Sequence, residues 1–170
     1  FRSRCHDSQR RFARALLVFV AAAILVGVWM NKAAAATFYV YAAKGNDTWD
    51  GTASVPRRGA RGPKATIMSA LAIAASGDTV LVAPGTYSEH ITIERDGVTL
   101  KRIGKGKVLL TSRFALACND SVLEGLTWEG QNGSSIINIY GKRNILRRCE
   151  FRRFGKERAC KAIWIKPGGD

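Results

Sequence analysis

The sequence is poor in the side chains that bind transition metals. Its 170 residues include two histidines and four cysteines, and no pair of cysteines has the spacing of a zinc site. We therefore expect no metal centre of the His/Cys type. Cys118, Cys149 and Cys160 lie in the part of the chain that follows residue 36. In an oxidising compartment they permit one disulfide and leave one thiol over.

The sequence also lacks a long apolar run. Its longest uncharged stretch near the start, 15–30, is short for a membrane span. Arg10, Arg11 and Arg14 precede this stretch and the small residues 33–36 follow it, which is the order of a secretory signal peptide. We predict that residues 1–36 are a signal peptide cleaved near Ala35 or Ala36, with a retained membrane anchor as the alternative. The protein is then secreted, periplasmic or at the cell surface.

Acidic residues are scarce. Thirteen Asp and Glu stand against 27 Lys and Arg, so the formal net charge is +14. Such a charge attracts polyanions, and for an exported protein an acidic polysaccharide is more accessible than nucleic acid or an anionic membrane. We therefore predict an acidic polysaccharide as partner, no nucleic acid, no membrane contact after signal cleavage, and a monomer. Solubility is the competing explanation of the charge.

After residue 78 the sequence lacks helical periodicity, which argues against a doubly wound α/β sheet. One short amphipathic helix precedes this point, between Thr66 and Ala75, with apolar residues at i, i+3, i+4 and i+7 and Gly77 placed to end it. The rest consists of short apolar runs between turn residues. We predict strands over 37–41, 79–83, 91–93, 98–101, 108–110, 121–128, 136–140, 144–151 and 162–165.

An internal repeat connects these strands. LEGLTW, from Leu123, aligns with LRRCEF, from Leu146, at an offset of 23 residues, and INIY, from Ile137, aligns with IWIK, from Ile163, at an offset of 26. Repeats of this length built from strands are typical of a β-solenoid, in which each coil pairs with the next and few strand edges stay exposed. The predicted helix would then cap the first coil.

The segment from YVYAAKGNDTWDGT to KATIMSALAIAASGDTVLVAPGTYSEHITI, residues 39–93, resembles the N-terminus of secreted right-handed parallel β-helix proteins of the pectin-lyase-like superfamily. The matching elements include Gly45-Asn46-Asp47, Thr66-Ile67, Gly77-Asp78-Thr79-Val80, Pro84-Gly85-Thr86-Tyr87 and Glu89. The fold class implied is all-β, a right-handed parallel β-helix with a short N-terminal capping helix. Residues 37–170 would form the N-terminal part of such a domain, truncated at its C-terminus.

The resemblance implies a carbohydrate-active protein, foremost a polysaccharide lyase acting on a uronate-containing polymer. In such lyases a Lys or Arg removes the proton beside the uronate carboxylate, often with calcium neutralising that carboxylate. The resemblance identifies no catalytic residue in this sequence. A noncatalytic β-helix for cell-surface binding or display is the alternative.

A basic cluster supplies the candidate binding site. Guanidinium groups match carboxylates in bidentate fashion, and cations stacked along a solenoid face would hold successive acidic groups. The candidate substrate-binding residues are Lys142, Arg143, Arg147, Arg148 and Lys166. Solvated turns are the competing interpretation. The tryptophans Trp128 and Trp164 would stack on sugar rings if exposed, although the repeat favours an inward position for Trp128.

Other polar residues have structural interpretations. Asn46, Thr48 and Asp50 are spaced like the first ligands of a calcium loop, but the twelfth position is Arg57, so an Asx-type turn is preferred and calcium stays a candidate cofactor. Asp78 is expected to satisfy backbone groups at the first coil.

The offset of 23 places one ion pair between coils. It sets Glu124 on an outward, exposed position opposite Arg147. Cys149 falls opposite Leu126 and is expected to be a small core residue.

Overall fold

The computed structural model describes residues 34–130, 137–152 and 163–165. Contacts divide the chain into two units, Phe1–Ala34 and Ala35–Asp170, and the description below concerns the second. None of the helices in the described ranges is long and apolar enough to cross a membrane. The predicted signal peptide or anchor, residues 1–36, falls almost entirely outside these ranges.

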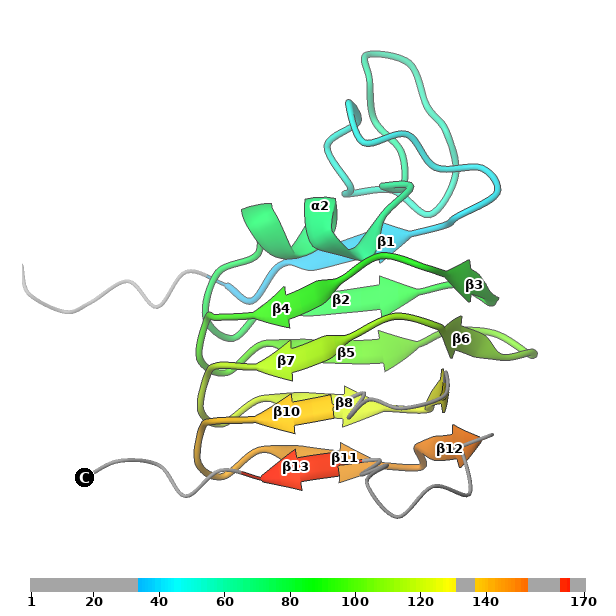
Figure 1. The fold of residues 1–170 in the computed structure, drawn as a ribbon. Helices are drawn as coiled ribbons and strands as arrows, with labels where there is room; N and C mark the ends of the chain where they lie inside the picture. The colour runs from blue at the N-terminus through cyan, green and yellow to red at the C-terminus, as the bar shows by residue number, and fades with distance from the viewer. Residues whose placement is uncertain (1–33, 131–136, 153–162, 166–170) are drawn as a thin grey trace, which may run out of the picture. The chain divides into compact units, whose positions relative to one another are not determined.

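The second unit is built from three parallel sheets (Figure 1). The first sheet contains, in order, β1 (Thr37–Val40), β2 (Thr79–Val82), β5 (Thr99–Arg102), β8 (Val122–Glu124) and β11 (Ile145–Arg147). The second contains β3 (Gly85–Tyr87), β6 (Val108–Leu110), β9 (Leu126–Glu129) and β12 (Glu150–Arg152). The third contains β4 (Ile91–Ile93), β7 (Phe114–Leu116), β10 (Ile137–Ile139) and β13 (Ile163–Ile165).

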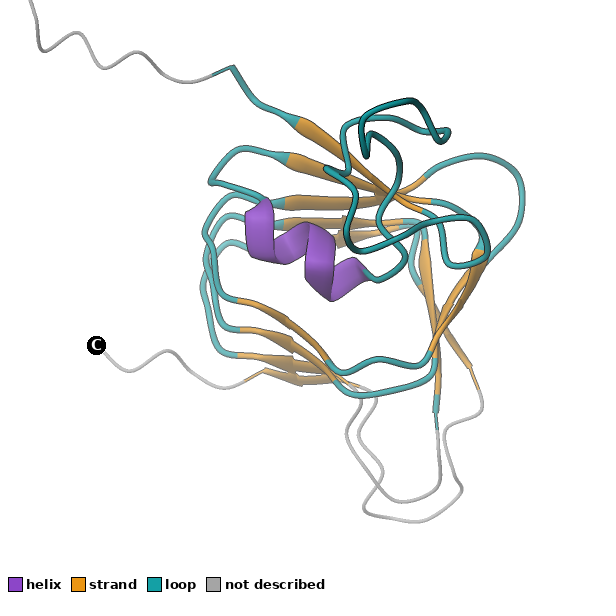
Figure 2. Ribbon diagram, turned by 90° about the horizontal axis from the view of Figure 1, so that it is seen from above, coloured by secondary structure: helices purple, strands orange, loops and turns teal. Residues whose placement is uncertain are grey.

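The chain visits the three sheets in turn and so forms coils. We number them by their strands: β2 to β4 form coil 2, β5 to β7 coil 3, β8 to β10 coil 4 and β11 to β13 coil 5, after the single strand β1. In Figure 1 strands β2, β5 and β8 run to the right, and β4, β7 and β10 run to the left in front of them. Seen from above in Figure 2, the chain turns clockwise as it descends, so the coil is right-handed. The predicted parallel β-helix is confirmed.

The predicted repeat is also confirmed by the strand register. Leu146 pairs with Leu123 and Phe151 with Trp128, at the offset of 23, while Ile163 pairs with Ile137 at the offset of 26. Each of these pairs points inward, and the fully buried Trp128 stacks on the ring of Phe151 with centroids 5.2 Å apart. The inward position expected for Trp128 is correct.

The one helix among the described residues, α2 (Ile67–Ile73), lies across the open end of the first coils (Figure 2). The predicted apolar face is buried, with Ile67 and Ala70 fully inaccessible to solvent. Thr66 is the N-cap, and its hydroxyl accepts a hydrogen bond from Ser69 N at 3.2 Å. The helix ends earlier than expected, since Gly77, at φ 89°, belongs to the turn that leads into β2. The capping role is confirmed.

Two carboxylates from outside the helix complete its N-terminus. Asp47 accepts hydrogen bonds from the backbone N–H groups of Ala65 and Thr66, at 2.8 and 3.0 Å. Glu89 accepts those of Ile67 and Met68, at 2.7 and 3.0 Å. Because a short helix leaves its first N–H groups without partners inside the helix, these two residues hold the cap in place.

Asp78 has the structural role that the sequence predicts. Its two carboxylate oxygens accept the N–H groups of Ala36 and Ala75, each at 2.7 Å, and so join the strand β1 to the turn after α2. Tyr87 is buried and donates its hydroxyl to Ala83 O at 3.0 Å. Burial raises the pKa of Tyr87 to about 12.

Two strands escaped prediction. The residues of β3 read as part of a Pro-Gly turn, and β7 contains alternating residues of mixed size in the sequence RFALA. Both pair in register with their neighbours in adjacent coils, which supplies the hydrogen bonds that local sequence does not specify.

Candidate functional site

The densest group of cations in the described residues lies at the corner between the first and second sheets. We call it the corner patch and define it as Lys101, Arg102, Glu124, Gly125, Arg147 and Arg148. Strands β5, β8 and β11 deliver these residues side by side, because Lys101 pairs with Glu124 and Glu124 with Arg147. The parallel register thus converts a sequence separation of 23 residues into one strand spacing of about 4.8 Å.

Glu124 is the centre of the patch. Its Oε2 lies 3.3 Å from Lys101 Nζ and 2.8 Å from Arg147 Nη2, and its Oε1 lies 3.1 Å from Arg148 Nη1. The side chain of Glu124 is 7% exposed, whereas those of Arg147 and Arg148 are 57% and 81% exposed. Hydrogen bonding from Arg147, followed by Lys101, holds the pKa of Glu124 below its usual value despite the cost of burial. The carboxylate is therefore ionised and orders the cations around it.

This arrangement confirms one expectation and corrects another. Glu124 faces Arg147 as the offset predicts. The expectation that Glu124 is solvent-exposed was wrong, because three cationic side chains from the coils on either side cover it. Thr127, on the next strand, is buried as well.

Gly125 lies between two arginines of the adjacent coils, and the side chain of Arg102 packs against it. It has φ 72°, and a Cβ built on it would lie 3.3 Å from both Cβ and Nε of Arg102. By register the residue opposite Gly125 in the next coil is Arg148. Arg102 and Arg148 thus lie above and below a position without a side chain, about 10 Å apart at their backbones. Guanidinium groups such as these two are donors that suit a carboxylate or a sulfate.

The adjoining turn adds further positive charge. Coil 3 has a longer connection between its first two strands, 103–107, than coil 4, where Gly125 alone separates β8 from β9. Arg102 Nη1 donates to Gly106 O at 2.8 Å, which ties its guanidinium to this turn. Lys105 is exposed in the same turn, and Lys107 pairs with Glu150 at 3.0 Å.

The structure separates the predicted binding residues into two groups. Arg147 and Arg148 belong to the corner patch. Lys142 and Arg143 lie at the opposite end of β11, where Arg143 makes a bidentate pair with Asp120 at 2.6 Å for both contacts. That pair raises the pKa of Arg143 and lowers the pKa of Asp120. Lys166, like Trp164's side chain, is outside the described residues.

Sequence reasoning missed Lys101 and Arg102. The repeat was recognised only between coils 4 and 5, so the cluster was limited to coil 5. Subtracting 23 twice from 147 and 148 leads first to Glu124 and Gly125 and then to Lys101 and Arg102. That signal was present in the sequence.

The loop after β1 contains turns where calcium ligands were considered. Asn46 Oδ1 accepts hydrogen bonds from Thr48 N at 2.9 Å and Thr48 Oγ1 at 2.8 Å. The carboxylate of Asp50 accepts hydrogen bonds from Thr52 N at 2.9 Å and Thr52 Oγ1 at 2.8 Å. These are Asx-type turns whose oxygens face N–H and O–H donors, so this set does not fit a calcium ion. Within the described residues no three His, Cys, Asp or Glu side chains gather as a metal site.

The two cysteines within the described residues, Cys118 and Cys149, are free thiols. Cys149 packs against the hydrophobic core, as its position opposite Leu126 predicts. Burial raises the pKa of both thiols. Cys160 is outside the described residues, so the expected disulfide stays a prediction.

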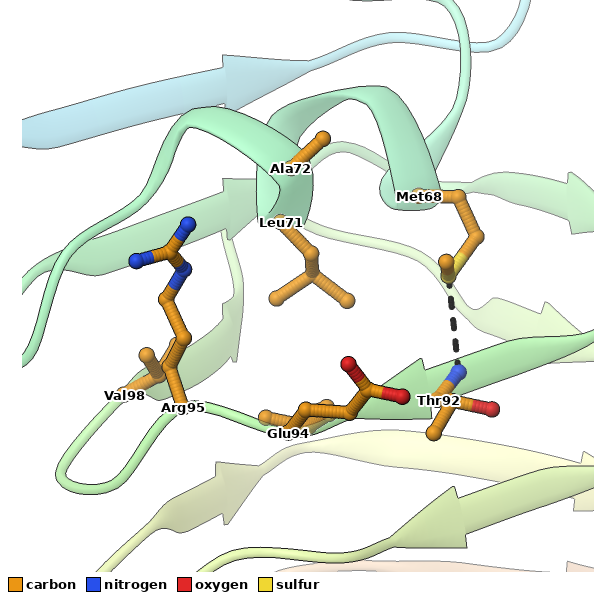
Figure 3. A pocket seen from close by; sticks show the side chains of 8 residues that line it. Met68, Leu71, Ala72, Thr92, Glu94, Arg95 and Val98 are labelled. Atoms are coloured by element: carbon orange, nitrogen blue, oxygen red, sulfur yellow. Dashed lines mark hydrogen bonds between the residues drawn. The ribbon is translucent and has the colours of Figure 1, made fainter.

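A cavity of about 260 Å³ lies between α2 and the free edge of β4 (Figure 3). Met68 and Leu71 reach down from the helix, and Glu94 and Arg95 project from the turn after β4. The thioether of Met68 is 3.4 Å from Thr92 N, which is a weak partner for a backbone donor. With one charge of each sign at its opening, the cavity has no preference for anions comparable to that of the corner patch.

Comparison with known proteins agrees with the fold and leaves the activity open. Residues 43–102 match a family model described as a protein of unknown function, DUF1565, a family associated with parallel β-helix proteins. Neither a curated protein nor a solved structure matches. The matched segment contains Asp47, Thr66, Asp78 and Glu89, the residues that fix the helical cap. The similarity therefore concerns the start of the β-helix and includes Lys101 and Arg102 at its edge.

Proposed function

We propose that this protein is an exported parallel β-helix protein that binds an acidic, uronate-containing polysaccharide at the corner patch. The observation that carries the proposal is the pair Arg102 and Arg148, which flank the bare position of Gly125 beside Lys101 and Arg147. Of these four cationic side chains, Lys101, Arg147 and Arg148 share the single carboxylate of Glu124, and Arg102 donates to Gly106 O instead. The patch thus retains positive charge after its internal pairing.

The chemistry of the patch suits a polymer more than a single small ion. Its cations come from β5 and from the end of β11, two strand spacings or about 10 Å apart along the coil axis. Guanidinium donors recognise carboxylate and sulfate groups through two parallel hydrogen bonds. A chain with an acidic group on successive sugars would contact several coils at once. Export and a secreted, periplasmic or cell-surface location follow from the signal-like pattern of residues 1–36.

Polysaccharide lyase activity is the second candidate and extends the first. Its support is the resemblance of residues 39–93 to pectin-lyase-like proteins, together with cations that would neutralise a uronate carboxylate. A Lys or Arg base and calcium belong to this candidate. Arg147 and Arg148 donate hydrogen bonds to Glu124, and groups that act as donors suit binding better than proton abstraction. Binding or display without catalysis is therefore the simpler form of the proposal.

Binding is tested by affinity electrophoresis in gels that contain pectate, alginate or chondroitin sulfate, with neutral dextran as the control polymer. We expect retardation in the acidic gels that decreases with salt. Arg148→Gly should weaken binding roughly tenfold, since charge-assisted hydrogen bonds are lost.

The matched control is Arg143→Gly. Arg143 and Arg148 have the same left-handed backbone, φ 59° and 54°, and both exchanges remove one positive charge. Equal losses for the two variants would show that net charge, rather than the corner patch, governs binding. No retardation of the wild type in any acidic gel would overturn the proposal.

Lyase activity is measured separately by the ultraviolet absorbance of unsaturated uronate ends, with calcium and with chelator. A rise on one polymer would establish cleavage, and its loss in chelator would assign a role to the metal. Binding without any rise would leave the noncatalytic form.

A further inference from the structure

The charged residues of the repeat alternate in sign from coil to coil. Residues 97–119 contain no Asp or Glu over 23 positions, and residues 114–141 contain no Lys or Arg over 28 positions. Each stretch is at least as long as one repeat. Coil 3 is therefore basic, coil 4 with the turn before it is acidic, and coil 5 with the turn before it is basic again.

Ion pairs between neighbouring coils follow this alternation. Glu124 of coil 4 contacts Lys101 of coil 3 and Arg147 of coil 5. Asp120, in the turn that leads into coil 4, contacts Arg143, in the turn that leads into coil 5. Since like charges directly opposite each other across strands are destabilising, the pattern favours stacking each coil on one of opposite sign.

Coil 5 has an unpaired side within the described residues. Its strands β11, β12 and β13 are each the last in their sheet. The inward residues Leu146, Phe151 and Ile163 are only partly buried, although their partners in coil 4 are fully buried. The edge therefore presents both open hydrogen-bonding groups and incompletely covered apolar side chains.

We infer that this edge is a docking surface for a further β-coil of net negative charge, which would continue the solenoid. In coil 5 and the turn before it, the described residues contain more cations than acids: they include Lys142, Arg143, Arg147, Arg148 and Arg152 against Glu150. A second copy of this chain does not fit this position. Its own coil 5 has the same charge, and α2 covers its other end. The inference is independent of polysaccharide binding.

The experiment inserts one extra coil into the full chain. A copy of residues 117–139 is placed between Ile165 and Lys166, which preserves the register because Ile165 pairs with Ile139, and Ile139 with Leu116. The copy has the hydrophobic pattern of coil 4 and its three acids, Asp120, Glu124 and Glu129. Two control inserts contain D120N/E124Q/E129Q and D120K/E124K/E129K, so the three proteins differ only in the charge of the added coil.

The protein with the acidic insert should have the highest Tm, the neutral insert a lower one and the basic insert the lowest. At low salt we expect about 3–10 °C between the acidic and basic inserts. The differences should shrink at high salt because the contacts are on the surface. If the basic insert does not fold, the acidic and neutral inserts decide the question. Equal Tm values for these two, or an acidic insert that leaves the wild-type Tm unchanged, would overturn the inference.

Discussion

The ring of Trp128 provides the sharpest test of how the core of this β-helix is held together. It is fully buried, lies edge-on to Phe114 with centroids 5.5 Å apart and stacks on Phe151 at 5.2 Å. Its indole N–H has no hydrogen-bond partner within the described residues. The side chain thus contributes a large apolar surface together with one unpaired buried donor.

These two contributions predict very different results for two substitutions. Trp128→Ala removes the whole ring and should cost about 3–5 kcal/mol. Trp128→Phe loses part of the ring, at about 0.8 kcal/mol for each carbon group removed, but also eliminates an unpaired donor whose burial costs about 1–3 kcal/mol. The Phe variant should therefore unfold within about 1 kcal/mol of the wild type.

Thermal unfolding followed by circular dichroism, supported by urea titration, measures both changes. The Ala variant should melt roughly 10 °C below the wild type, and the Phe variant within a few degrees of it. Equal losses for the two variants would refute the reasoning. That result would mean that the N–H is satisfied, or that the fit of the indole ring outweighs its unpaired donor.

Two further predictions concern the helical cap. Glu89→Ala leaves the N–H groups of Ile67 and Met68 without their carboxylate and should destabilise the protein by about 1–3 kcal/mol in urea titration. Glu89→Gln keeps one acceptor oxygen and should cost less. Equal losses of stability for the two variants would contradict the role of Glu89 as a double acceptor. For Asp47, burial raises the pKa, but hydrogen bonds from Ser69, Thr66 and Ala65 outweigh it and leave the pKa below the ordinary 3.8. Ionised Asp47 should make the wild type more stable than the Asp47→Asn variant. This difference in unfolding free energy should be complete above pH 3.8 and disappear as the pH falls through the lowered pKa. A difference that persists at still lower pH in acid unfolding curves would refute this.

The β-helix could be predicted from sequence because its repeat appears in two pairs of strand segments, LEGLTW with LRRCEF and INIY with IWIK. Leu123 and Leu146 keep their type between coils, so alignment at 23 residues revealed them. The strands that escaped, β3 and β7, have no local signal of this kind and depend on pairing with neighbouring coils. Propensity cannot reveal a strand whose stability comes from hydrogen bonds to residues 23 positions away.

The candidate site could be predicted only in part for the same reason. Arg147 and Arg148 were recognised as a cluster because they are adjacent in sequence. Their contact with Lys101 through Glu124 required the register of three coils. The sequence also placed Arg143 and Arg148 in one predicted cluster because they are close along the chain, although β11 separates them in the structure. The cluster predicted from the sequence therefore corresponds to two separate groups in the structure, one at each end of β11.

The backbone at Arg148 separates a binding role from a purely structural one. Arg148 has φ 54° and Arg143 φ 59°, a left-handed conformation that costs a residue with a side chain about 1–2 kcal/mol relative to glycine, the residue found at the equivalent position 125. At Arg143 a bidentate pair with Asp120 accompanies this strain. Arg148 makes a single contact with Glu124 and is 81% exposed, so its internal contacts offset less of the strain. Strain that the fold does not require is better explained by an external partner. Arg148→Gly should consequently leave the Tm unchanged or higher while it weakens retention in acidic gels, and a marked loss of Tm would instead assign Arg148 to the fold.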